Sequence, residues 1–224
     1  MNVLAFASRK GGAGKSTLAA HLAAHVQSPM RRCLLIDDDP QGSLTLWNKL
    51  HPELGLPLKT IKRDVGHIVK KAERHGIDWV FIDTPSNSSL SVIDAIEAAT
   101  LVVIPCRPGL FDIDAVKETI AFAEKVRTPY AVVFNGAPPK RQDMESPAVA
   151  SARRWLGQMQ VPVWGGQITH RASLSLALSE ADGGKGADDP CSIAEIGGLW
   201  SAIEKSVRVI HGARDKAAMH RVAA

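Results

Sequence analysis

Short runs of apolar residues recur along the chain, and segments with the periodicity of amphipathic helices separate them. Such runs are typical of strands buried on both faces, as in parallel sheets that helices cover. The pattern therefore predicts an α/β fold, a doubly wound, mostly parallel sheet with helices on both faces. The predicted strands are Val3–Ala7, Cys33–Ile36, Trp79–Ile82, Leu101–Ile104, Tyr130–Phe134 and Val161–Trp164.

Polar residues stand directly after several of these strands, among them Asp37, Asp83 and Asn135. Because ligands of open parallel sheets bind beyond the carboxyl ends of the strands, we expect the functional site at that edge. A chain of 224 residues with 45% hydrophobic content fits a single domain over residues 1–224. Its apolar runs are shorter than a membrane span, and it opens on a strand rather than a signal peptide.

A glycine-rich loop lies between the first predicted strand and an amphipathic segment over residues 18–26. Strand, glycine-rich loop and helix in this order make a phosphate-binding loop, because glycine lets backbone amides turn inward around phosphate oxygens. Lys15 is expected to reach the β- and γ-phosphates, and Ser16 to offer its hydroxyl to Mg²⁺. The nucleotide-binding candidates are Gly11, Gly12, Ala13, Gly14, Lys15, Ser16 and Thr17. A chance glycine-rich turn with two solvated lysines is the alternative.

The loop departs from the common pattern G-x-x-x-x-G-K-[S/T], because Arg9 stands where the first glycine belongs and a second lysine, Lys10, follows it. This K-G-G-x-G-K-S-T loop resembles the deviant Walker A motif of the ParA/MinD ATPases, and the small ParF-like partition proteins most of all. The resemblance implies that Lys10 crosses a dimer interface to the phosphates of the partner's ATP.

Two acidic motifs extend this resemblance. The segment over residues 34–43 is similar to the D-x-D-P-Q-G-S segment of ParA proteins, which implies that Asp39 activates the attacking water and that Asp37 supports the Mg²⁺ hydration shell. Capping aspartates before a helix are the plainer reading of that turn. Asp83, at the end of an apolar strand, matches a Walker B carboxylate that holds Mg²⁺. Asn135 matches the family's adenine-recognising asparagine, although an Asn-Gly turn explains it equally well.

The C-terminal third carries the basic residues of interest. Over the whole chain, lysine and arginine number 27 against 23 aspartate and glutamate, a balance that permits a polyanionic partner. A final helix is predicted from Ile193 to about Ile210, and a glycine-rich loop over residues 181–190. The resemblance implies sequence-independent DNA binding by a basic surface, and a solvated helix face is the alternative. The DNA-binding candidates are Arg171, Lys205, Arg208 and Arg214.

The resemblance implies an ATPase that forms an ATP-dependent sandwich dimer, binds DNA non-specifically and drives the partition of plasmid or chromosomal DNA. Turnover is expected to be slow, since no strong general base stands in the motifs, and to be stimulated by a ParB-like protein or a cargo adaptor. The cofactors are ATP and Mg²⁺, and the expected location is the cytoplasm, at the nucleoid. One alternative is a chromosomally encoded ATPase that positions a protein cargo, such as a chemoreceptor cluster or a microcompartment.

Other proteins with this loop leave traces that the sequence lacks. Relatives that hold a metal cluster need cysteines to ligate it, or a C-x-x-C pair. Here Cys33, Cys106 and Cys191 lie far apart, which indicates reduced thiols. A MinD-like membrane ATPase needs bulky apolar residues in its C-terminal helix, and the segment over residues 211–224 has few. We therefore expect no membrane partner. A metabolic P-loop enzyme remains the lesser alternative.

Overall fold

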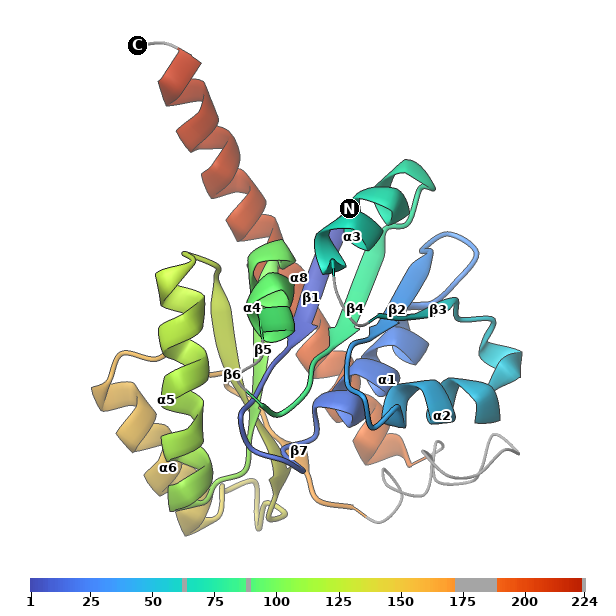
Figure 1. The fold of residues 1–224 in the computed structure, drawn as a ribbon. Helices are drawn as coiled ribbons and strands as arrows, with labels where there is room; N and C mark the ends of the chain where they lie inside the picture. Colours follow the sequence, from blue (N-terminus) through green and yellow to red (C-terminus); the bar gives the residue numbers. More distant parts are fainter. Residues whose placement is uncertain (62–63, 88–89, 172–188, 223–224) are drawn as a thin grey trace.

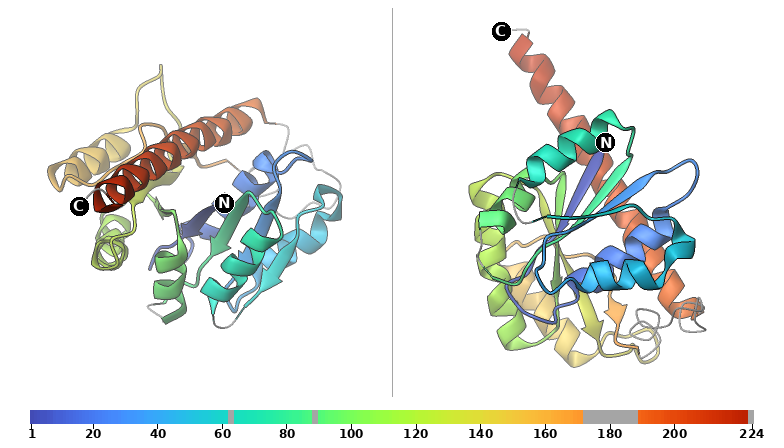
Figure 2. Two further views of the ribbon diagram at one scale, coloured as in Figure 1. Left: turned by 90° about the horizontal axis from the view of Figure 1, so that it is seen from above. Right: turned by 45° about the vertical axis from the view of Figure 1, so that its right-hand side comes forward.

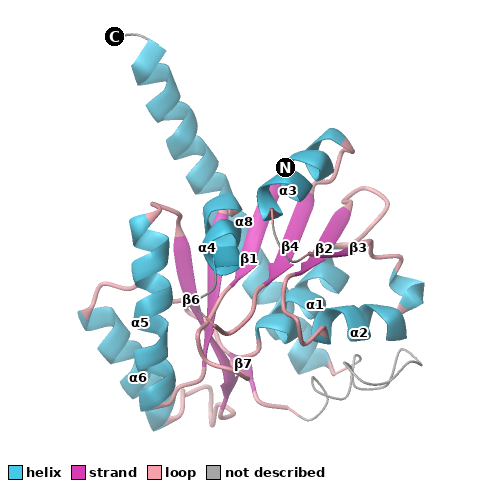
Figure 3. Ribbon diagram, viewed as in Figure 1, coloured by secondary structure: helices cyan, strands magenta, loops and turns pink. Residues whose placement is uncertain are grey.

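The fold is described from a computed structural model, which covers residues 1–61, 64–87, 90–171 and 189–222. Among these residues, seven strands form one sheet in the order β3-β2-β4-β1-β5-β6-β7, and every pairing is parallel (Figures 1 and 3). The predicted doubly wound sheet is confirmed. The strands are β1 Asn2–Phe6, β2 Cys33–Asp37, β3 Leu58–Thr60, β4 Trp79–Asp83, β5 Leu101–Cys106, β6 Tyr130–Ala137 and β7 Ile168–Thr169.

Helices cover both faces of the sheet, and each face has its own apolar core (Figure 2). One core takes residues from α3 (Val65–Arg74), α4 (Leu90–Ala98), α5 (Leu110–Lys125) and α6 (Pro147–Gln158). The other takes them from α1 (Lys15–Val26), α2 (Ser43–Leu50) and α8 (Pro190–Val222). A 3-10 turn, η1 (Pro52–Leu54), follows α2. Strand residues alternate between the two cores, as in a sheet buried on both sides.

The structure corrects two predicted elements. Residues 161–164 form one isolated bridge, Val132 with Val163, rather than a strand. The final helix is longer than predicted at both ends, since α8 runs from Pro190 to Val222, and its C-terminal end projects beyond the sheet in Figure 1. Most of the loop predicted over residues 181–190 lies outside the described residues.

Register in the sheet fixes which strand ends meet at its carboxyl edge. Phe6 of β1 and Asp37 of β2 both lie opposite Asp83 of β4. Thr84 donates to the Phe6 carbonyl oxygen through its backbone amide, at 3.4 Å, and through its hydroxyl, at 2.8 Å. The glycine-rich loop therefore leaves the sheet directly beside two carboxylates that sit far away in sequence.

Candidate nucleotide-binding site

The glycine-rich loop connects β1 to α1 and depends on two left-handed glycines. Gly12 has φ +71°, and Gly14, the residue before α1, has φ +100° and ψ 27°. A side chain at either position would be strained in this region of backbone space, so glycine is required there. The turn ends where the Leu18 amide donates to the Gly14 carbonyl at 2.9 Å. The loop thus delivers its amides to the N-terminus of α1, which favours anions.

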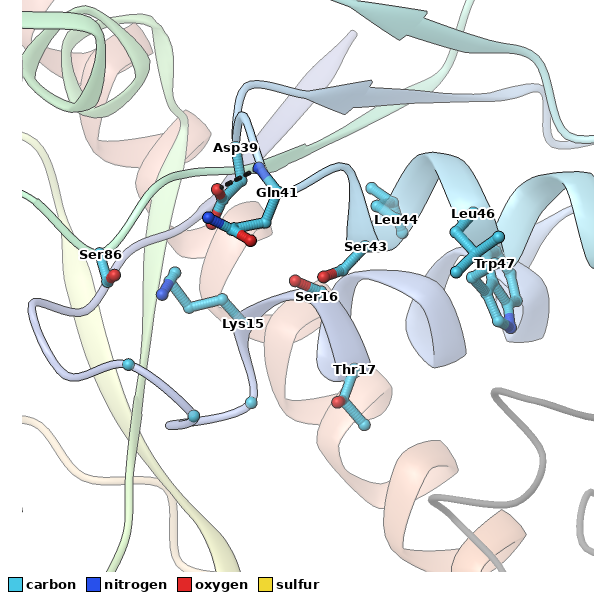
Figure 4. A pocket seen from close by; sticks show the side chains of 13 residues that line it. Lys15, Ser16, Thr17, Asp39, Gln41, Ser43, Leu44, Leu46, Trp47 and Ser86 are labelled. Carbon is cyan, nitrogen blue, oxygen red and sulfur yellow. Dashed lines mark hydrogen bonds between the residues drawn. The ribbon is translucent and has the colours of Figure 1, made fainter.

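A cavity of about 490 Å³ opens inside the loop (Figure 4). Its walls come from the loop and α1, from the segment that follows β2 and continues into α2, and from Ser86 after β4. The predicted residues that line it are Gly11, Gly12, Gly14, Lys15, Ser16, Thr17 and Asp39. Ala13, also in the loop, is buried and does not line the cavity. The cavity therefore brings together most of the predicted phosphate-binding residues with the predicted water-activating aspartate.

Lys15 is the buried cation of this cavity, with only 6% of its surface exposed. In Figure 4 its side chain extends toward the space between Ser86 and Asp39. Burial lowers the pKa of Lys15, while the negative charges of Asp83 and Asp39 oppose that change. A charged ammonium without water needs an anionic partner, and phosphate oxygens in the cavity would supply one.

Asp37 uses both carboxylate oxygens to hold the segment that leads into α2. Its Oδ2 accepts from the Thr45 amide at 2.8 Å and from the Thr45 hydroxyl at 2.5 Å. Its Oδ1 accepts from the Asp39 amide at 3.2 Å, and Asp39 in turn accepts from the Gln41 amide at 3.0 Å. This geometry supports Asp39 in its place at the cavity wall. The role of Asp37 in the Mg²⁺ hydration shell stays a prediction.

Asp83 is a fully buried carboxylate whose two oxygens both lack a hydrogen bond. Burial raises its pKa to about 7, and the neighbouring Ser16 hydroxyl and Lys15 ammonium oppose this rise. Beside it, burial also raises the pKa of Asp38 to about 6, and one Asp38 oxygen is unpartnered too. These buried carboxylates need a cation or a proton.

The residues present fit a nucleotide-bound Mg²⁺ better than a metal held by protein alone. Within the described ranges, no group of three or more histidine, cysteine, aspartate or glutamate residues is arranged to hold a metal ion. Mg²⁺ in nucleotide sites keeps several waters and shares its shell with phosphates, so few protein ligands are needed. The Ser16 hydroxyl and the unpartnered Asp83 carboxylate would hold it, directly and through water. When bound, the ion would neutralise charge on the β- and γ-phosphates.

The buried Asp83 carboxylate predicts a pH-dependent stability of the protein without nucleotide. An unfolded aspartate has a pKa of 3.8, so between about pH 4 and 7 the folded state binds more protons and stability falls as pH rises. Asp83→Asn cannot ionise, and we expect it to be more stable than wild type by about 4 kcal/mol at pH 8, because each unit of the pKa rise is worth about 1.4 kcal/mol. The difference should close by pH 4. Thermal or urea unfolding of both proteins across this range measures it, and equal stability at pH 8 would contradict the prediction.

Lys10 lies outside this cavity. Its side chain is exposed, and its backbone amide bonds to the Ser8 hydroxyl at 3.4 Å. The preceding Arg9 forms an ion pair with Glu118 of α5, which ties the start of the loop to that helix. Lys10 therefore stands at the rim of a phosphate site that already contains its own lysine, Lys15.

The far side of the loop is occupied by side chains from the ends of β5 and β6. Asn135 donates its Nδ2 to the Ala13 carbonyl at 2.8 Å. The Arg107 guanidinium lies beside Gly12, where an added Cβ would come 3.6 Å from its Nη2. The amide nitrogen of Asn135 is thus engaged with the loop itself, and its predicted contact with adenine stays a prediction.

Comparison with known proteins assigns the family. Residues 4–207 match the model of the CobQ/CobB/MinD/ParA nucleotide binding domain. The chain belongs to this family. The resemblance to the ParA and MinD ATPases is confirmed, and with it the expectation of a nucleotide-binding P-loop fold.

The names of individual relatives of this ParA/MinD-type chain refer to different cargoes. It is 31% identical over 154 residues to the chromosome-partitioning ATPase Soj of Thermus thermophilus, a match covering 55% of this chain and 62% of Soj. It is 33% identical over 128 residues to maintenance of carboxysome distribution protein A of Gloeobacter kilaueensis, covering 53% and 55%. The McdA–ATP complex of Cyanothece has the same fold, with TM-score 0.70 and 18% identity over 91% of this chain and 96% of that one. The chain matches little more than half the length of these two curated relatives.

The DNA-binding candidates of this ParA/MinD-type chain fall into two groups. Arg171 bonds through Nη1 and Nη2 to the two Glu195 carboxylate oxygens, at 2.7 and 3.0 Å, and lies 3.5 Å from Asp189. Lys205, Arg208 and Arg214 are exposed on α8. The first group is one arginine held by carboxylates, and the second is three exposed cations at different angles around α8.

Sequence reasoning missed several residues of this ParA/MinD-type site. Ser86 and Trp47 line the cavity, and Arg107 lies behind the loop. The rule that polar residues after buried strands gather at the site would have found Arg107, because it directly follows β5. Nothing in the local sequence marks Trp47, which lines the cavity from α2. Among the described residues, no helix is long and apolar enough to cross a membrane.

Proposed function

We propose that this chain is a ParA-like ATPase whose ATP-bound form is a dimer that binds DNA non-specifically and serves in partition. The observation that carries the proposal is the different placement of two lysines in one loop. Lys15 is buried in the phosphate cavity, whereas Lys10 is exposed at its rim. A second cation outside its own cavity has the position needed to serve a phosphate held by another copy.

The surface around the loop supports a face-to-face dimer. Leu90 begins α4, and Leu110 and Phe111 begin α5, which also holds Arg9 through Glu118. These three large apolar side chains are 80%, 71% and 80% exposed. All three stand at helix starts on the carboxyl edge of the sheet, where the loop also lies, and exposed apolar side chains there favour an interface. A second copy placed over the loop would cover them while its Lys10 approaches the first copy's phosphates.

Hydrolysis in this proposal depends on positioning and charge. Asp39, held at the cavity wall, orients the attacking water, and Lys15 with the partner's lysine stabilises charge on the transferring phosphoryl group. A site without a strong general base turns over slowly. We therefore propose that a ParB-like protein or a cargo adaptor stimulates turnover, for instance by inserting an arginine.

The DNA surface proposed here is the part of α8 that carries Lys205, Arg208 and Arg214. Arg208 lines a hollow with Arg31 and the N-terminal Met1, while Glu204 in the same hollow pairs with Arg31 at 3.1 Å. His211 bonds to Asn2 at 2.8 Å, so this part of α8 lies at the amino end of β1. The phosphate loop follows the opposite end of that strand. DNA and ATP would therefore bind at opposite edges of the sheet.

This separation gives a physical reason for ATP-dependent DNA binding. One copy offers few cations, and each phosphate contact contributes a limited, salt-sensitive gain. ATP-dependent dimerisation would join two α8 surfaces, so that the second binds at high effective concentration once the first has bound. The nucleotide would thus control DNA affinity without touching the DNA surface.

Binding to random-sequence duplex DNA tests the proposal, with no nucleotide, with ADP and with Mg-ATP, across a salt series. We expect tight binding only when Mg-ATP is present, and weak binding with ADP or without nucleotide. Arg208→Ala should weaken the binding with Mg-ATP equally on all sequences and lower the salt slope by about one per subunit, because each subunit neutralises one DNA phosphate fewer. Arg154→Ala is the matched control, because Arg154 is exposed on α6, over the other face of the sheet. Intact ATPase activity without DNA binding in any state would remove DNA from the proposal.

The Arg171→Ala variant needs a stability measurement beside the DNA-binding measurement. Removing Arg171 leaves Glu195 without its main cationic partner, so Arg171→Ala should lose stability as well as any affinity that this arginine gives for DNA. Unfolding measured beside DNA binding separates the two effects.

A positioning ATPase for a protein cargo is the second candidate. The similarity to the carboxysome distribution protein and to the McdA fold favours it. Its ATP site and DNA surface would be the same as those of a partition protein, and both would act at the nucleoid in the cytoplasm. Identification of the stimulatory partner by co-purification with the ATP-bound protein would tell the two functions apart.

A further inference from the structure

Asn135 contacts the phosphate loop from a strand that is distant in sequence. It lies at the carboxyl end of β6, where the register with β7 shifts between Asn135 and Ala137. Its Nδ2 donates to the Ala13 carbonyl oxygen at 2.8 Å, across 122 residues of sequence. The contact is close: a Cβ added at Gly14 would come 1.9 Å from Nδ2 and 3.1 Å from Cγ. Position 14 therefore requires glycine for two reasons: its backbone is left-handed, and a Cβ there would clash with Asn135.

The geometry of the peptide bond links this contact to phosphate binding. The Ala13 carbonyl and the Gly14 N–H belong to one planar trans peptide, so they point in opposite directions. Asn135 holds the carbonyl from behind the loop, and Gly14 lines the cavity in front. Holding the carbonyl therefore turns the Gly14 N–H toward the cavity, where inward-facing amides form an anion-binding concavity.

We propose that Asn135 is a positioning residue that fixes the phosphate loop in its anion-binding conformation. The proposal rests on the nucleotide-binding function proposed above and differs from a role in reading adenine. An adenine reader distinguishes bases, whereas a loop-positioning residue acts on every ligand that carries the same phosphates. The two roles therefore predict different ligand dependences.

Asn135→Leu removes the amide donor and keeps the size of the side chain. In nucleotide-free protein, hydrogen exchange of peptides over residues 8–17 should become about tenfold faster, as expected for the loss of one hydrogen bond. Affinities for Mg-ATP, Mg-GTP and inorganic tripolyphosphate should fall together by about tenfold, with the ratio of ATP to GTP affinity unchanged. Asn135→Ala should behave in the same way, which guards against an effect of leucine's shape.

Asn2→Leu is the matched control. Asn2 also makes one long-range side-chain hydrogen bond, to His211, but at the amino end of β1. It should leave exchange in the loop and all three affinities unchanged. Unchanged loop exchange in both Asn135 variants would overturn the proposal, and so would a loss confined to ATP, which identifies an adenine reader. Failure of wild type to bind Mg-ATP would instead contradict the proposed function. The exchange experiment, done without nucleotide, would still test whether Asn135 holds the loop.

Discussion

Lys10→Ala is expected to lower ATP hydrolysis by at least about 100-fold while ATP affinity falls by less than about tenfold. The reason is that Lys10 lies outside the cavity that contains Lys15, so its own nucleotide loses little. A cation supplied in trans to a transferring phosphoryl group is worth about 10³–10⁵ in rate in related chemistry. Phosphate release, calorimetric ATP binding and light scattering with ATP measure hydrolysis, affinity and dimerisation. Dimerisation should be lost together with hydrolysis.

Lys125→Ala is the control for this variant, because Lys125 is exposed at the far end of α5. It should retain wild-type hydrolysis and dimerisation. A Lys10→Ala protein that still dimerises with ATP would break the proposal that Lys10 acts across the interface.

Asp39→Ala should also lower hydrolysis by about 100-fold, but it should trap the ATP-bound dimer. Asp39 lines the cavity near Lys15, and losing it removes the group that orients water without removing a phosphate ligand. Stable dimers with ATP in light scattering and slow phosphate release are the expected pair of results. Asp39→Asn can still accept from the Gln41 amide, so it separates loss of charge from loss of local geometry. Rapid turnover in Asp39→Ala would assign the water to another group.

The two variants together test the trans arrangement directly. A mixed dimer of Lys10→Ala and Asp39→Ala subunits contains one site with an intact Asp39 and the partner's intact Lys10. Mixing two inactive proteins should therefore restore hydrolysis. If Lys10 served its own nucleotide, both sites would stay defective and the mixture would stay inactive.

The sheet itself could be predicted closely because strands buried on both faces leave a clear apolar signal. Two errors have physical causes. Residues 161–164 contain Pro162, which has no N–H to donate to a neighbouring strand, and the segment makes one bridge only. The missed β3 is a short edge strand with half-buried Leu58 followed by two exposed residues, so it carries no apolar run.

The reach of α8 beyond Ile210 was also missed. Its later part carries few apolar residues, so periodicity gives no signal there. Alanine, lysine and arginine in that segment favour helix by intrinsic propensity. Propensity was therefore the better guide at this end of the chain.

By itself the sequence determined the phosphate loop, the strands around it and the carboxylates that end them. These features depend on local chemistry: glycine where φ is positive, apolar residues in buried strands, polar residues where strands end. Tertiary structure alone decided what each polar group contacts. Asp37 bonds to Thr45, Asp83 has no partner, Arg171 pairs with Glu195 and Asn135 holds Ala13. Hydrogen bonds and ion pairs reach only a few ångströms, so their partners follow from how strands and helices meet in space, which no local pattern records.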